Sequence, residues 1–313
     1  MLGRRNLRIK VMQTLFGKEI SSDVPLQFME GQLKSNILRS SSLYLTLLEY
    51  ICAVCRYANT DKDRRAGKYL KTNEDINLST LITRNRITTA ITESVWLQAL
   101  IKKEKISQWI DEDLVRKLYL QLVALPRYKE YAKLSESTLD ADIDLVGFLV
   151  KNILTKNSDL DKHLEEHFMN VDDDSGTLWI VIQKYISGFE KAGVKPFEDA
   201  IGYWEAEQPF AYDLLKKNFA HNDELRALIL PYLKNWDPER VAVMDFLILK
   251  MALCELLYCP TVPVKVTINE YIDISKFYST PKSKDFVNGV LDKIKNQLME
   301  DGSIKKQGRG LVE

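Results

Sequence analysis

Cysteine, glycine and proline are all scarce in this sequence. Its 313 residues include four cysteines, 13 glycines and nine prolines. Four cysteines are too few for a disulfide scaffold, and so few glycines and prolines are atypical of a turn-rich all-β chain. Short alternating strand patterns are almost absent, whereas apolar residues recur at helical spacing, as at Leu43, Leu47, Ile51 and Val54. The sequence therefore predicts an all-α protein.

Net charge and uninterrupted apolar runs are missing as well. Lys plus Arg and Asp plus Glu number 44 each, which disfavours a protein that coats nucleic acid by bulk charge. The most apolar window, residues 241–258, contains Asp245, Lys250 and Glu255, so a core helix is favoured over a membrane span. Met1 leads directly into charged residues rather than an apolar signal segment. We therefore expect a cytoplasmic protein with no membrane partner.

Charge is nevertheless distributed unevenly. Residues 1–18 carry five basic side chains and no acid, whereas residues 136–174 hold eleven acids and three lysines. Arg4, Arg5 and Arg8 fall within about 100° of one another on a helix. Guanidinium groups suit phosphate oxygens and stack on bases, so this helix is a candidate RNA-binding element. A solvated terminus that binds nothing explains the same cluster.

Two separated motifs carry a family resemblance. Residues 263–270 read PVKVTINE, and residues 283–293 read SKDFVNGVLDK. These motifs resemble the NusB family of transcription antitermination factors, and residues 3–16 (GRRNLRIKVMQTLF) resemble the arginine-rich opening helix of that family. The resemblance covers residues 3–18 and about 205–298. Family members are usually about half this length, so the chain resembles a long form with a large insertion.

The resemblance implies a NusB-like helical bundle with a large helical insertion after the first helix. Residues 1–20 and 205–300 would form the RNA-binding helical domain, and residues 21–204 the insertion, to which no role is assigned. Residues 301–313 read as a flexible tail.

The resemblance also implies a function. The family contains RNA-binding transcription antitermination factors that act with NusE, a small-subunit ribosomal protein, on single-stranded boxA-type leader RNA of ribosomal RNA operons. They work in the transcription elongation complex, catalyse no reaction and need no cofactor. One alternative stays open: a helical protein-interaction adaptor, in which the insertion docks a protein and RNA binding is degenerate.

Most site residues follow from matching positions, whereas Lys282 and Lys284 are included because they add charge just before Phe286. A further family arginine falls on Asn6, which weakens or removes that contact. Phe16 and Asp245 match positions expected at the NusE interface. For Tyr232 and Phe286, periodicity alone favours core packing. The predicted RNA-binding residues are Arg4, Arg5, Arg8, Tyr232, Lys250, Lys282, Lys284 and Phe286.

Two enzyme-like motifs have simpler interpretations. His163, Glu166 and His167 fit H-x-x-E-H, but neighbouring charged residues indicate a solvated helix face. Cys52 and Cys55 fit C-x-x-C inside an apolar helical stripe, which indicates core cysteines rather than a redox or zinc site. The sequence therefore predicts neither a catalytic site nor a metal site.

Two local features complete the predictions. Residues 60–77 are polar and mixed in charge, which predicts a loop. Gly289 follows an asparagine, as in a hairpin turn, but its neighbours keep helical spacing, so we expect it inside a helix that packs closely against another.

Overall fold

The computed structural model describes residues 3–20, 24–70, 72, 78–233, 242–280 and 282–311. Every regular element in these ranges is a helix, so the predicted all-α class is confirmed. The described residues form two compact units. One, here called the inserted unit, is Leu38–Glu205; the other, here called the terminal unit, combines residues 3–37 with the chain from Ala206 onward.

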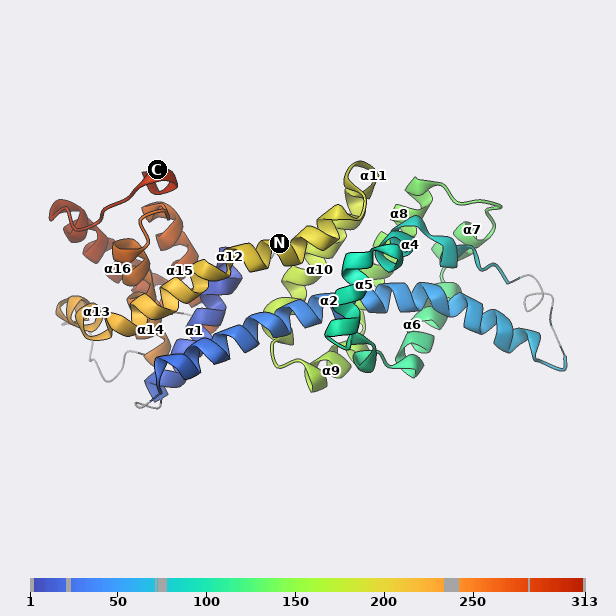
Figure 1. Ribbon diagram of the computed structural model, residues 1–313, viewed down its shortest axis with the longest axis horizontal. Helices are drawn as coiled ribbons and strands as arrows, with labels where there is room; N and C mark the ends of the chain where they lie inside the picture. Colours follow the sequence, from blue (N-terminus) through green and yellow to red (C-terminus); the bar gives the residue numbers. More distant parts are fainter. Residues whose placement is uncertain are drawn as a thin grey trace. The chain divides into compact units, whose positions relative to one another are not determined.

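The terminal unit is a bundle around one central helix (Figure 1). Helix α14 contacts α1, α13, α15 and α16. Eleven of the sixteen residues of α14 are buried, which is typical of a helix that is apolar on all sides and lies in a core. The core-helix prediction for residues 241–258 is therefore confirmed for the described residues. The elements of this unit are α1 (Arg4–Ile20), the start of α2 (Leu26–Ala66), the end of α12 (Lys195–Ala220), α13 (Asn222–Ile229), the 3₁₀-helix η4 (Leu230–Leu233), α14 (Val243–Tyr258), α15 (Val264–Tyr278), α16 (Ser283–Glu300) and the 3₁₀-helix η6 (Gly308–Leu311).

Both C-terminal motifs are helical. PVKVTINE opens α15, whose first residue follows Pro263, a position where the fixed φ of proline suits a helix start. Gly289 lies inside α16, as expected. A Cβ atom built on Gly289 would meet no atom within 4 Å, so the prediction of close packing there is wrong. The helical spacing of its apolar neighbours is what keeps this segment helical.

The C-terminal segment folds back onto the bundle. The Gln307 amide donates to the Pro260 carbonyl at 2.9 Å. The Lys306 Nζ donates to the carbonyls of Glu255 and Cys259 at 3.2 and 3.1 Å. These bonds join the C-terminal segment to carbonyls in the last turn of α14 and in the residues that follow it. Part of the segment expected to be a flexible tail thus makes hydrogen bonds to the bundle, and its flexibility stays a prediction.

The inserted unit has its own apolar core. Side-chain caps fix several helix starts; the Ser94 Oγ, for example, accepts from the Leu97 amide. Its elements are the remainder of α2, η1 (Leu81–Arg84), α4 (Arg86–Glu93), α5 (Val95–Lys103), η2 (Ile106–Trp109), α6 (Glu112–Ala124), α7 (Pro126–Ala132), α8 (Leu139–Asn152), η3 (Leu154–Lys156), α9 (Ser158–His167), α10 (Val171–Ser187), α11 (Phe189–Ala192) and the start of α12.

Helix α2 is longer than its sequence suggests. Asp61 is fully buried and accepts hydrogen bonds from Arg64 and Arg65, three and four residues later. These pairs neutralise one another along one helix face, so the loop prediction is wrong for residues 60–66. By length and composition α2 could span a membrane, but 78% of its apolar window is buried within the protein, as in a core helix.

The unit boundary also falls inside α2. Met29, Leu33 and Ile37 pack in the core of the terminal unit. The chain therefore passes from one unit to the other after Ile37 and before Ala206, whereas the sequence suggested boundaries at residues 20 and 205. The assignment of RNA binding to one domain stays a prediction.

Candidate nucleic-acid interface

The arginines of α1 are all paired with carboxylates. The Arg4 Nε donates to Glu207 at 2.6 Å, and the Arg4 guanidinium lies 4.9 Å from the ring centre of Phe210. Arg5 makes two 2.8 Å bonds to Glu270 and one 2.9 Å bond to Asp273. Hydrogen bonding to Glu270 is the main reason that the pKa of Arg5 is raised. The side chains of Arg4 and Arg5 remain 38% and 44% exposed.

Arg8 differs because its guanidinium is buried. Its side chain is 2% exposed, and two 2.7 Å bonds join it to Glu255, whose side chain is fully buried. Thr267 and Tyr271 of α15 also donate to this carboxylate, at 2.8 and 3.2 Å. Burial lowers the pKa of Arg8, but the hydrogen bonds and charge of Glu255 outweigh burial, so the net pKa is raised. Arg8 and Glu255 therefore form a buried, doubly hydrogen-bonded ion pair.

Each of the three charges that interrupt α14 links α14 to a neighbouring helix. Residues five apart on a helix differ by about 140° in direction, so Asp245, Lys250 and Glu255 point to three sides of α14. Glu255 receives Arg8 of α1. Asp245 accepts from the Ser283 Oγ of α16 at 2.7 Å. Lys250 donates to Glu19 of α1, and to Asn222 of α13 at 2.8 Å.

The start of α16 presents the other predicted cations. Lys282 and Lys284 are exposed, and Phe286 is half-buried against the core of the terminal unit. Ser283 between the two lysines is buried and bonded to Asp245. The structure thus brings Lys282, Lys284 and the Phe286 ring together at the start of α16. Asp245 lies beneath this surface and is only 5% exposed.

Tyr232 lies at the other end of α16. Its hydroxyl donates to Gln297, which follows Phe286 by eleven residues. Eleven residues correspond to about three turns and about 16 Å along a helix axis, so Tyr232 contacts the face of α16 that carries Phe286. Both rings are half-buried. They border one side of α16 without touching one another.

Two of the predicted RNA-binding residues, Arg8 and Lys250, are buried inside the bundle. Arg8 is 1% exposed and Lys250 is 5% exposed, and both are held by carboxylates. A buried, ion-paired cation presents no N–H group to a strand at the surface. Breaking such a pair costs about 3–5 kcal/mol, more than a phosphate contact returns. The geometry therefore makes Arg8 and Lys250 internal links of the bundle.

Two cation–ring contacts were missed by the sequence reasoning. The Lys18 Nζ lies 3.9 Å from the ring centre of Phe219, and the Arg226 guanidinium lies 5.5 Å from that of Phe246. Burial and the nearby Lys250 charge lower the pKa of Lys18. No short sequence spacing connects these partners, so only the fold reveals them. Phe16, the predicted NusE contact on the same helix as Lys18, is half-buried on the core.

The residues of the enzyme-like motifs make structural contacts, and His163 is half-buried rather than on a solvated face. His163 Nε2 is 2.8 Å from the Trp109 carbonyl, and its ring stands edge-on to that of His167. Cys52 and Cys55 are buried thiols, and burial raises the pKa of Cys55 to about 12. In the described part of the chain, no group of three or more metal-ligating side chains could hold an ion.

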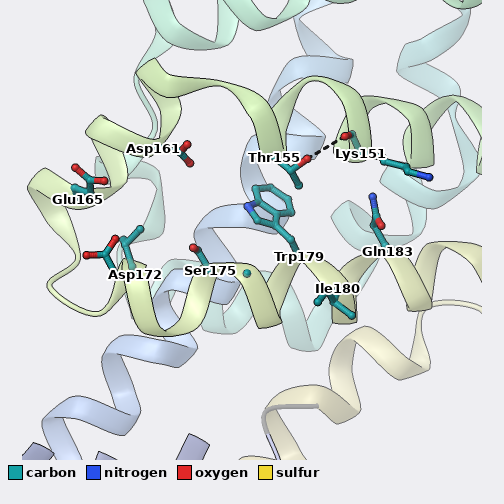
Figure 2. A pocket seen from close by; sticks show the side chains of 11 residues that line it. Lys151, Thr155, Asp161, Glu165, Asp172, Ser175, Trp179, Ile180 and Gln183 are labelled. Carbon is teal, nitrogen blue, oxygen red and sulfur yellow. Dashed lines mark hydrogen bonds between the residues drawn. The ribbon is translucent and has the colours of Figure 1, made fainter. Parts of the chain in front are cut away.

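The inserted unit contains a cavity of about 510 Å³ between α8, η3, α9 and α10 (Figure 2). Asp161, Glu165 and Asp172 gather at one end, and Lys151 lies at the other. Burial and the Glu165 charge raise the pKa of Asp161. Because these carboxylates repel phosphate, this cavity is no extension of an RNA surface.

The fold and the site define an all-α bundle domain whose arginine-bearing first helix is fastened by ion pairs to C-terminal helices. Residues 193–296 match the model of the NusB family. Three curated relatives carry the name transcription antitermination protein NusB. The protein of Chloroherpeton thalassium is 37% identical over 121 residues, which are 39% of this chain and 56% of the relative. The protein of Salinibacter ruber is 42% identical over 33% of this chain and 64% of the relative. The protein of Geobacter sulfurreducens is 40% identical over 31% of this chain and 70% of the relative.

The chain belongs to the NusB family. It spans only 56% and 64% of the lengths of the first two relatives, and it is longer than the homologues, which is consistent with an extension. No solved structure matches it.

Proposed function

We propose that this protein is an RNA-binding transcription antitermination factor. In this proposal it acts in the cytoplasm with NusE on single-stranded boxA-type leader RNA of ribosomal RNA operons, as part of the transcription elongation complex. It catalyses no reaction and uses no cofactor. The observation that carries the proposal is the likeness of residues 193–296 to the NusB family, whose curated members bear the antitermination name.

RNA would contact the exposed cations of the terminal unit. Exposed ion pairs contribute about 0–1 kcal/mol, so phosphates can replace Glu207 at Arg4 and the α15 carboxylates at Arg5 at little cost. Lys282 and Lys284 would bind phosphates beside the Phe286 ring. Base stacking on rings such as Phe286 and Tyr232 contributes about 1–3 kcal/mol per base. Single-stranded RNA needs this combination of charge and ring surface.

The buried residues would position this surface. Arg8 and Lys250 hold α1 against α14, and α1 in turn presents Arg4 and Arg5. Asp245 fixes the start of α16 through Ser283. In the proposal Phe16 borders the NusE surface, whereas the buried Asp245 contributes only by positioning the start of α16.

Titration of labelled RNA tests the proposal. A fluorescent single-stranded boxA-type RNA is added to the whole chain with and without NusE, and anisotropy is recorded at several salt concentrations. We expect NusE to tighten binding. The log–log salt slope should be near −0.7 per phosphate contact, or about −3 for four cations. A scrambled RNA of equal composition is the control, and equal binding of both RNAs would contradict the boxA assignment.

The adaptor alternative has its own support. All three arginines of the first helix are already paired with carboxylates, and Asn6 replaces a family arginine. The inserted unit adds a separate core and an acidic cavity. If the chain binds NusE but no RNA at low salt, the adaptor function replaces the RNA-binding one.

A further inference from the structure

A second cavity lies in the terminal unit, between α15, α16 and the C-terminal segment. Its volume is about 950 Å³. The upper range of ligand pockets is about 1,000 Å³, so this cavity has room for several side chains. It opens to solvent, because Lys265, Asn269, Asn296 and Lys305 on its edge are exposed. We call it the α15–α16 groove.

The floor of the groove is aliphatic. Val264 and Ile268 are four residues apart on α15 and therefore form one stripe. Met299 of α16 is 57% exposed, and Leu311 of the C-terminal segment is 68% exposed. Ile304 completes the floor. Because these flexible aliphatic side chains are exposed to solvent, a second apolar surface that packed on them would bury their apolar area.

The edge of the groove is basic. Among the described residues that line it, four are lysines and none is acidic. Lys295 is paired with Asp292 at 2.7 Å, and Lys306 caps α14. Lys265 and Lys305 make no hydrogen bond or ion pair to any residue that the structure describes. An acidic occupant would meet these two ammonium groups without displacing an internal partner.

The groove lacks the features that hold RNA bases. The described residues that line it include no aromatic ring and no arginine, so they offer no flat surface for stacking. An aliphatic floor between lysines instead suits an amphipathic helix, which places apolar residues at i, i+3, i+4 and i+7 in a groove and charges at the edges.

We propose that the α15–α16 groove binds an acidic amphipathic helix of a partner protein. The leucine-type side chains of that helix would lie on Val264, Ile268 and Met299, and its carboxylates would pair with Lys265 and Lys305. None of the residues that line this groove is among those proposed to bind RNA, so the proposal does not rest on the proposed RNA function.

A designed probe peptide tests the groove. The probe is fluorescein-labelled, helical, and carries leucines at i, i+3, i+4 and i+7 with glutamates on its flanks. We expect it to bind the whole chain with a Kd below about 100 µM. A matched peptide with lysines in place of the glutamates should not bind. Absence of glutamate-peptide binding would overturn the proposal.

Variants locate the binding site. The double change Lys265→Glu with Lys305→Glu, and separately Met299→Asp, should each weaken peptide binding at least about tenfold, which corresponds to about 1.4 kcal/mol. Lys293→Glu is the matched control, because Lys293 is exposed on α16 but does not line the groove. Circular dichroism verifies that each variant is folded. Equal loss with the control would assign the binding to general charge and overturn the proposal.

Two further outcomes identify other occupants. If an unlabelled oligouridine RNA displaces the peptide, the groove is a nucleic-acid site and the proposal is wrong. If sedimentation shows a dimer that Met299→Asp dissociates, a second copy of this chain occupies the groove and the proposal is again wrong. RNA titrations of the groove variants keep the two functions distinct, since these variants should bind boxA-type RNA like the unmodified chain.

Discussion

Arg8 and Glu255 form a buried ion pair that joins the first helix to the central helix across 247 residues of sequence. The two 2.7 Å bonds are parallel, from Nε and Nη2 to the two carboxylate oxygens. Thr267 and Tyr271 complete the coordination of the carboxylate. One arginine of the predicted RNA-binding cluster therefore serves to fasten the helix that presents the other two.

Arg8→Met tests this role. It leaves Glu255 buried without its cation, so we expect a loss of about 3–5 kcal/mol in the unfolding free energy of the terminal unit. The double change Arg8→Met with Glu255→Leu removes both charges, so its unfolding free energy should fall less than that of Arg8→Met alone. Urea denaturation measures both. We expect folded Arg8→Met protein to bind RNA with an affinity within about threefold of that of the unmodified chain. A loss of RNA affinity as large as that of Arg5→Glu would instead show that Arg8 contacts RNA directly.

The carboxylates around Arg5 should compete with RNA. Asp273→Asn removes one exposed partner of Arg5, so we expect RNA to bind about two- to fivefold more tightly at low salt. Arg5→Glu should weaken binding at least about tenfold and make the salt slope shallower by about 0.7. Anisotropy titrations measure both changes. Arg116→Glu is the control, because Arg116 is exposed on α6 of the inserted unit. An unchanged affinity in both Arg5→Glu and Asp273→Asn would remove Arg5 from the interface.

Gly289→Ala should stabilise the terminal unit. Gly289 is exposed inside α16, and an added Cβ would meet nothing within 4 Å. Alanine costs about 1 kcal/mol less than glycine in a helix, so we expect a gain of about 0.5–1 kcal/mol. Gly302→Ala is the opposite case, since Gly302 has φ +67°, and it should lower stability. Thermal denaturation compares the two variants. A loss of stability in Gly289→Ala would contradict the open space around Gly289.

Buried thiols should make stability fall at alkaline pH. Burial raises the pKa of Cys55 to about 12 and that of Cys259 to about 11. An unfolded chain releases these protons near pH 9, whereas the folded chain retains them, so stability is full below pH 9 and decreases as pH rises toward 11–12. Each thiol contributes up to about 1.4 kcal/mol per pH unit.

Urea denaturation in reductant at pH 8, 9 and 10 measures this slope. Cys55→Ala should make it shallower, whereas Leu48→Ala, a buried truncation on the same helix, should lower stability equally at each pH. The lowered pKa of Lys306, caused by burial, has the opposite sign, because an unfolded lysine binds its proton more tightly and stability rises toward pH 10.5. If the slope of Cys55→Ala equals that of the unmodified chain, this thiol does not titrate on unfolding.

The sequence determined the helical class, the central helix and the family resemblance. Apolar spacing is a local property, so α14, α15 and α16 could be read from it directly. The sequence also showed that Asp245, Lys250 and Glu255 interrupt an apolar run, and that Arg8 is one of a cluster. It could not show that Arg8 and Glu255 meet, or that residues 26–37 of α2 belong to the terminal core.

Only the tertiary structure decided which cations are exposed at the surface and which are buried. Arg5 and Arg8 have the same side chain and lie on the same helix, yet one is 44% exposed and the other 2%. The physical reason is that burial and ion pairing depend on groups hundreds of residues away in sequence. A pattern of spacing specifies the direction in which a side chain points on its own helix, whereas the packing of the other helices determines what that side chain meets.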